Sequence, residues 1–289
     1  MGTQSFLKPD PEQIRHQIRG ILDSYSHEWD LLAELTQNAI DSITRQKPVK
    51  GHIQIELDAP NRSLVIKDNG GGIDPNELPR LLRPFGSDKM KDSSQVGQKG
   101  VGLTFVTFST SSFEIETHHA NGSAKATIVG ADNWVDLEGD EELYINIDQV
   151  EPGENGTKLT LKIADSDHPL WGLSHNELEY VLRTRTALGN TAHVWGGSVN
   201  CDFAVIHIDK SGDKWAAERE CEYLLPSNIL PDHGSISLED FENWLADGDR
   251  DDIEKRRKLK DKLLFTAGKK NQAARTIHYG RASFPTEHS

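Results

Sequence analysis

The chain has 289 residues, of which 35% are hydrophobic and 27% charged, so it can form one large or two smaller globular domains. Its formal net charge of −14 argues against a surface coated for nucleic acid or anionic membrane. No apolar run approaches the roughly 18–20 residues that span a bilayer, and the first residues lack the apolar stretch of a secretory signal. With two cysteines and no disulfide framework, we expect a cytoplasmic protein without a membrane partner.

Two helices are predicted before residue 50. Apolar residues at helical spacing indicate the first over residues 11–24, with Asp10 as its cap and Pro11 at its first position. The second helix runs from about residue 26 to residue 46. Its apolar residues share one face, and they are Leu32, Leu35, Ala39 and Ile43.

Alternating apolar residues then predict six strands, the first two of which form a hairpin. Their ranges are 52–57, 63–67, 113–117, 124–129, 143–147 and 157–163. A short helix at 76–82, a polar stretch without periodicity and an apolar run at 101–108 lie between the second and third strands. Residues 1–165 therefore predict an α+β fold, a two-layer α/β sandwich on a mixed, largely antiparallel sheet.

Residues 166–289 predict a smaller appended region. Its expected elements are a helix at 177–188, a strand at 199–208 and charged helices at 239–245 and 250–264. Residues 250–281 hold 11 Lys and Arg against 4 Asp and Glu, whereas the remainder of the chain holds 21 against 42. This basic segment could contact nucleic acid or a partner protein, or pack against the acidic body. Its few aromatic residues give little support for base stacking.

The second predicted helix carries Glu34, Asn38 and Asp41 on a stripe roughly opposite its apolar face. Such a stripe is most often a solvated polar surface. The chemical interpretation is that a carboxylate and a carboxamide one turn apart could orient a water molecule and hold Mg²⁺ through oxygen.

Asp68, Gly70 and Gly72 follow at the end of the second predicted strand. Glycines at this place let the backbone approach a ligand closely. Asp68 could accept a hydrogen bond from an exocyclic amine, or it could cap a tight turn.

Gly97, Gly100 and Gly102 lead into the apolar run at 101–108. Free N–H groups at a helix N-terminus attract phosphate, and glycines allow several of them to converge on it. The segment has no Walker pattern and follows no strand of a βαβ unit, so neither a P-loop nor a Rossmann site is predicted.

In this order, Glu34-x-x-x-Asn38, Asp68-x-Gly70-x-Gly72 and Gly97-x-x-Gly100-x-Gly102 resemble the N, G1 and G2 boxes of the GHKL ATPases. That superfamily joins gyrase B, the ninety-kilodalton heat-shock chaperones, histidine kinases and MutL. Thr157, within Asn155-Gly156-Thr157-Lys158, resembles the Gly-Thr element of the family's last core strand. The resemblance covers roughly residues 20–165 and implies the Bergerat ATP-binding fold.

The resemblance implies roles for the matching residues. Glu34 would be the general base that orients the attacking water, Asn38 would be the Mg²⁺ ligand, and Asp41 would brace the glycine turn. Asp68 would bind the adenine amino group, with Thr157 reaching the base through water. Lys99 could equally be an exposed loop lysine. The other implied ATP contacts are Gly70, Gly72, Ile73, Lys89, Gly97, Gly100, Val101, Gly102 and Leu103.

A stretch before the third box adds a lid to this expectation. Residues 84–89 resemble the Ser-x-Lys stretch of chaperone and MORC-type members, so residues 86–100 would form an ATP lid that closes over the γ-phosphate. Ser87 and Lys89 could also be ordinary solvated loop residues.

A carboxylate in the first box favours attack by water, and hence hydrolysis over transfer to protein. We expect a Mg²⁺-dependent ATPase whose nucleotide state closes a homodimer or reorganises the chain, acting on DNA or a partner protein. Residues 166–289 would then begin a transducer domain, and the nearest analogies are MORC-like and bacterial antiviral-defence ATPases. Two alternatives stay open, a histidine or protein kinase of the same fold and a non-hydrolysing ATP-binding scaffold.

Overall fold

The computed structural model describes residues 10–86, 101–192 and 200–224. The chain divides into two compact units, one made of residues 1–190 and 198–222 and the other of residues 191–197 and 223–289. All described helices and strands lie in the first unit. None of the described helices is both long and apolar enough to cross a membrane.

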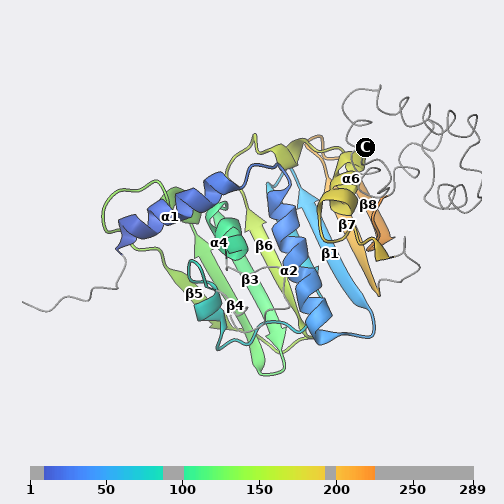
Figure 1. Ribbon diagram of the computed structural model, residues 1–289, viewed down its shortest axis with the longest axis horizontal. Coiled ribbons are helices and arrows are strands. Elements are labelled where there is room, and N and C mark those ends of the chain that lie inside the picture. The colour runs from blue at the N-terminus through green and yellow to red at the C-terminus, as the bar shows by residue number, and fades with distance from the viewer. Residues whose placement is uncertain (1–9, 87–100, 193–199, 225–289) are drawn as a thin grey trace, which may run out of the picture. The chain divides into compact units, whose positions relative to one another are not determined.

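One mixed sheet organises the first unit (Figure 1). In the described residues it has eight strands in the order β5-β4-β3-β6-β2-β1-β7-β8. Strands β1 and β7 are parallel, and every other neighbouring pair is antiparallel. The predicted mixed, largely antiparallel sheet is therefore confirmed. The strands are β1 (Gly51–Asp58), β2 (Ser63–Asp68), β3 (Ser112–His119), β4 (Gly122–Val129), β5 (Ile145–Gln149), β6 (Gly156–Lys162), β7 (Cys201–Ile208) and β8 (Lys214–Glu220).

The larger helices cover one face of this sheet, as Figure 1 shows for α1, α2, α4 and α6. The opposite face is polar, and one row across four strands consists of Lys67, Lys158, Glu116 and Lys125. One buried and one polar face make the fold the two-layer sandwich that the sequence predicts. The helices are α1 (Pro11–Ser24), α2 (Asp30–Gln46), α3 (Leu78–Leu81), α4 (Val101–Phe108), α5 (Ala131–Trp134) and α6 (His175–Arg185), with a 3₁₀ turn at Pro169–Gly172.

Local sequence signals account for the first two helices. The Asp10 carboxylate accepts a hydrogen bond from the Gln13 amide at 2.7 Å, as an N-cap does, and Pro11 stands at the first helical position. Helix α2 begins at Asp30 rather than at residue 26, because the Asp30 carboxylate accepts from the amide of His27 and holds a turn before the helix. The predicted apolar face of α2 is buried over its whole length.

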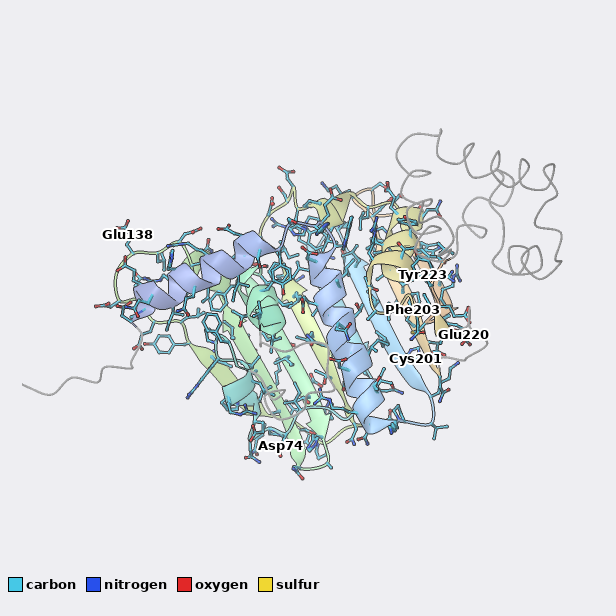
Figure 2. All side chains as sticks on the ribbon, in the orientation of Figure 1. Asp74, Glu138, Cys201, Phe203, Glu220 and Tyr223 are labelled. Atoms are coloured by element: carbon cyan, nitrogen blue, oxygen red, sulfur yellow. The ribbon has the colours of Figure 1, made fainter. Side chains whose placement is uncertain are left out.

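The compact unit continues past residue 165, where we expected a boundary. Strand β7 pairs in parallel with β1 along all eight residues, from Gly51 opposite Cys201 to Asp58 opposite Ile208, and β8 pairs with β7. Figure 2 shows Cys201 and Phe203 of β7 and Glu220 of β8 at this end of the sheet. Because β7 satisfies the outer backbone groups of β1 and buries Phe203, it extends the same core. The basic segment at 250–281 and the helices predicted after residue 225 lie outside the described residues.

Candidate functional site

Helix α2 presents Glu34, Asn38 and Asp41, each of them partly buried. Glu34 Oε1 accepts a hydrogen bond of 2.8 Å from the Tyr25 hydroxyl, and the Tyr25 ring stacks on Phe105 of α4 with 3.7 Å between ring centroids. Burial and the bond to Glu34 raise the pKa of Tyr25, so the hydroxyl keeps its proton and donates. The stacked ring therefore holds the Glu34 carboxylate in one orientation.

The same carboxylate lies against the first turn of α4. A Cβ atom added at Gly102 would stand 1.9 Å from Glu34 Oε2, so this turn can approach the carboxylate only because residue 102 has no side chain. The structure thus brings the first and third motifs together. Val101 and Leu103, partly buried, flank Gly102 in that turn. Four other expected phosphate contacts lie outside the described residues, namely Lys89, Gly97, Lys99 and Gly100. The expected lid at 86–100 also lies outside them, except for its first residue, Gly86.

Asp68 ends β2 with only 6% of its surface exposed. Its Oδ1 accepts a hydrogen bond from the Gly70 amide at 2.8 Å and another from the Ser42 hydroxyl at 3.1 Å. Burial nevertheless raises the pKa of Asp68 to about 6, although the hydrogen bonds from Gly70, Ser42 and the Thr157 backbone lower it. At neutral pH the site therefore contains a buried carboxylate that has lost most of its water.

The loop after Asp68 passes close to other backbone and needs its glycines. A Cβ atom at Gly70 would lie 2.1 Å from Ser42 Oγ, and one at Gly72 would lie 2.1 Å from the carbonyl oxygen of His118. Gly72 also has φ +69°, a conformation that side chains disfavour. Next to it, the Ile73 amide donates to the Thr117 hydroxyl at 2.6 Å, which pins the loop to β3.

Strand register places the expected adenine-end residues in one buried row. Asp68 lies opposite Thr157 of β6, and Thr157 lies opposite Thr117 of β3. All three side chains are less than 10% exposed on the helix-covered face. Asp68, Gly70, Gly72 and Thr157 therefore form one cluster, and Glu34 and Gly102 form a second.

Helix α2 connects the two clusters, because Glu34 and Ser42 stand eight residues apart, or about 12 Å at 1.5 Å per residue. Asn38 lies midway between them. Asp41 accepts a hydrogen bond from the side-chain amide of Gln37 at 2.9 Å. Ser42 and Gln46, later on the same helix, lie against the glycine turn at Gly70 and Gly71.

Sequence reasoning missed three residues of this site, namely Tyr25, Ser42 and Thr117. Ser42 lies one turn beyond Asn38 and could have been found by extending the polar stripe. Tyr25 precedes α2, and Thr117 belongs to an alternating strand, so neither had a local signal.

Comparison with known proteins agrees with this geometry. Residues 25–157 match the family described as histidine kinase-, DNA gyrase B-, and HSP90-like ATPase. The matched range contains every residue of both clusters. Residues 25–157, a little under half of the chain, are therefore similar to the GHKL ATPase domains. The sheet and its helical layer agree with the Bergerat fold that the resemblance implied, and ATP is the nucleotide that this family binds.

The chain also resembles curated chaperones. Chaperone protein HtpG of Helicobacter pylori is 29% identical over 167 residues, and the match covers 50% of this chain and 25% of the chaperone. The protein of the same name from Enterobacter is 27% identical over 190 residues, and this match covers 57% of this chain and 28% of the chaperone. The match thus spans about a quarter of these relatives' length.

Proposed function

We propose that this GHKL domain binds ATP with Mg²⁺ and hydrolyses it. The observation that carries the proposal is the fixed Glu34 carboxylate, held by Tyr25 against the first turn of α4 at one end of α2. The buried Asp68 carboxylate lies toward the other end of the same helix. A general base on α2 and an amine acceptor at the end of β2, near the opposite end of that helix, suit a ligand with a reactive phosphate chain and an aromatic amine.

Asp68 is the proposed adenine contact. Its ionised form is poorly solvated, so a hydrogen bond from an exocyclic amine would replace water that burial has removed. Thr157 would reach the base through water from the neighbouring strand position. Gly70, Gly72 and Ile73 would form the wall of the pocket, since their backbone is fixed by Ser42 and Thr117.

The phosphates would lie between α2 and the start of α4. Asn38 offers a carboxamide oxygen, a ligand type that suits Mg²⁺. The α4 N-terminus would offer backbone amides, since the first N–H groups of a helix have no acceptor within it. Bound Mg²⁺ would neutralise phosphate charge. Glu34 would orient a water molecule and accept its proton. The roles of Asp41 in bracing the site, and of Lys89, Gly97, Lys99 and Gly100 at the phosphates, remain proposals from the sequence.

Substitution of Glu34 by Gln tests the base directly. The amide keeps the shape of the side chain and can still accept from Tyr25, so Glu34→Gln should bind Mg·ATP within about threefold of wild type. Turnover should fall by at least 100-fold, the usual scale of losing a general base. Binding is measured by calorimetry and turnover by phosphate release. Glu28→Gln is the matched control, because Glu28 is exposed just before α2, and this variant should bind and hydrolyse ATP as wild type does.

Each outcome decides between the candidate activities. Undiminished hydrolysis by Glu34→Gln would refute Glu34 as the base. Tight Mg²⁺-dependent binding by wild type without any turnover would identify a non-hydrolysing scaffold. Transfer of label from γ-labelled ATP to protein would identify a kinase, the less favoured alternative because the similar proteins named above are chaperones.

We also propose that ATP gates dimerisation or a change of conformation that acts on a partner protein or DNA. The chaperone relatives support the partner-protein form. The DNA form and the MORC-like or antiviral-defence analogy rest on residues 87–89 and 250–281, outside the described residues. Size-exclusion chromatography with and without a non-hydrolysable ATP analogue tests this gating. An elution shift to the dimer is expected, and unchanged elution would contradict the dimerisation step.

A further inference from the structure

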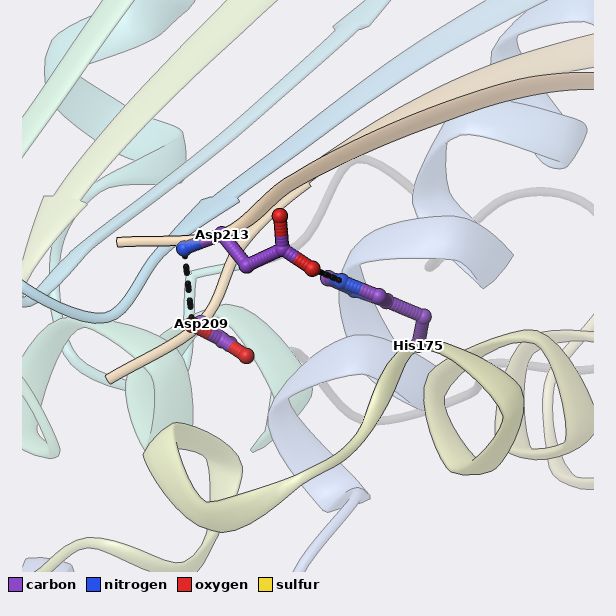
Figure 3. Close-up of side chains that lie close together, drawn as sticks. All are labelled: His175, Asp209 and Asp213. Atoms are coloured by element: carbon purple, nitrogen blue, oxygen red, sulfur yellow. Dashed lines mark hydrogen bonds and ion pairs between the residues drawn. The ribbon is translucent and has the colours of Figure 1, made fainter. Parts of the chain in front are cut away.

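Three metal-ligating side chains meet at the edge of the sheet that β7 and β8 form. His175 is the first residue of α6, whereas Asp209 and Asp213 belong to the turn between β7 and β8. One ligand atom from each residue lies within 4.8 Å of the other two. Figure 3 shows the His175 ring and the Asp213 carboxylate pointing toward one another, with Nε2 and Oδ2 3.4 Å apart.

The turn fixes the position of Asp209. Its Oδ1 accepts hydrogen bonds from the Ser211 amide at 2.8 Å, the Ser211 hydroxyl at 2.6 Å and the Asp213 amide at 3.0 Å. Gly212, at φ +85°, closes the turn. None of these three bonds uses Oδ2 of Asp209, so a second oxygen remains for a ligand.

The other side of the His175 ring is held by a buried histidine. His175 Nδ1 lies 2.8 Å from Nδ1 of His207, whose side chain is fully buried. Trp215 stacks on His175 with 5.7 Å between ring centroids, so the imidazole is confined on a face as well as an edge.

This confinement restricts the protonation of the pair, because two Nδ1–H groups cannot face one another. If His175 donates to His207, the lone pair of His175 Nε2 points at the Asp213 carboxylate, an arrangement that a cation between them would stabilise. If His207 donates, His175 Nε2 carries the proton and donates a hydrogen bond to the Asp213 carboxylate, which leaves no lone pair for a metal ion. Nε2 of His207 is buried without a hydrogen-bond partner among the described residues in either case.

We propose that His175, Asp209 and Asp213 bind one divalent transition-metal ion of the Zn²⁺ type, with His207 orienting His175. One imidazole nitrogen with two carboxylate oxygens suits Zn²⁺, whereas Mg²⁺ and Ca²⁺ prefer oxygen alone. A metal-bound histidine commonly has its second ring nitrogen held by another group, as His207 does here. The ion would tie the start of α6 to the β7–β8 turn, separate from the nucleotide.

One of the three distances already fits a metal ion. Ligand atoms at about 2.0–2.1 Å from a tetrahedral Zn²⁺ stand about 3.3–3.4 Å apart, close to the 3.4 Å between His175 Nε2 and Asp213 Oδ2. The ligand atoms of all three residues lie within 4.8 Å of one another, so the ion would draw Asp209 closer to the other two, and Asp213, whose side chain is 75% exposed, can rotate to follow. Water would complete the coordination.

The test titrates Zn²⁺ into the full chain, stripped of metal and free of nucleotide, with calorimetry and Trp215 fluorescence as readouts. Wild type should bind one equivalent with a change in fluorescence, and Mg²⁺ should produce none. His175→Gln and Asp213→Asn should each weaken Zn²⁺ binding at least tenfold. His16→Gln, an exposed histidine on α1, is the control and should bind as wild type does. Trp215→Phe should lose the signal but keep the calorimetric affinity.

Thermal melting separates binding from folding. Zn²⁺ should raise the melting temperature of wild type and of His16→Gln, but not that of Asp213→Asn, whose neutral amide preserves the side-chain shape. Equal Zn²⁺ affinity in wild type and His175→Gln would overturn the proposal. No Zn²⁺ binding by wild type up to 100-micromolar concentrations would also overturn it and leave His175 and Asp213 as a hydrogen-bonded pair.

Discussion

Asp68 offers a case in which the proposed function opposes stability. Replacing Asp68 with Asn keeps an oxygen that can accept from Gly70 and Ser42, but removes the charge that burial disfavours. The amide that replaces the other oxygen cannot accept from the adenine amino group. We therefore expect Asp68→Asn to stabilise the nucleotide-free fold and to abolish ATP binding.

The magnitude follows from the pKa, which rises from 3.8 to about 6 on folding. Each unit corresponds to about 1.4 kcal/mol, so the ionised group destabilises the fold by about 3 kcal/mol at neutral pH. Between the two pKa values the folded state binds more protons than the unfolded state, so this group makes the free energy of unfolding fall as pH rises. About 1.4 kcal/mol of the loss develops between pH 5 and 7.5. Asn at this position does not titrate, so the variant does not lose this part of the free energy of unfolding as pH rises.

Urea denaturation of the nucleotide-free protein at pH 5 and pH 7.5 measures this effect. Asp68→Asn should exceed wild type in unfolding free energy at both values, and the excess should grow toward pH 7.5. Asp148→Asn, exposed on the edge strand β5, should show no such growth. An excess that is absent, or that shrinks as pH rises, would refute the reasoning about Asp68. Retained ATP affinity in Asp68→Asn would refute its proposed role at the adenine.

Two further substitutions probe the ends of the site. Tyr25→Phe keeps the stacking on Phe105 but removes the hydrogen-bond donor to Glu34. Phosphate release should therefore slow by roughly tenfold, while the affinity for ATP stays unchanged. Turnover at the wild-type rate would mean that Glu34 does not need the hydrogen bond from Tyr25. Gly72→Ala places a side chain on a residue with positive φ and against the His118 carbonyl. Urea denaturation should therefore show a loss of about 1–3 kcal/mol in the free energy of unfolding. Gly20→Ala, on open α1 surface, should instead leave stability unchanged or improve it by up to about 1 kcal/mol, and similar losses for both would contradict the argument.

Much of the fold could be predicted because its signals are local. The cap at Asp10, the apolar face of α2 and the alternation of β1 and β2 each depend on neighbours within a few residues. Backbone geometry alone translates such spacing into a helix or a strand. The same holds for Glu34 and Asn38, because one turn of helix places them on one stripe.

What lies against that stripe was decided by tertiary structure. Contact between Gly102 and Glu34 joins residues 68 positions apart, and the pairing of β7 with β1 joins residues 150 apart. No local pattern predicts which unpaired strand edge a later strand will fill, so the sheet extended past the expected boundary. Tyr25 and Thr117 became site residues for the same reason: a hydroxyl carries no local signal until packing supplies its hydrogen-bond partner. The sequence alone was enough to infer the nucleotide chemistry, while close packing decided which side chains hold Glu34 and Asp68 in place.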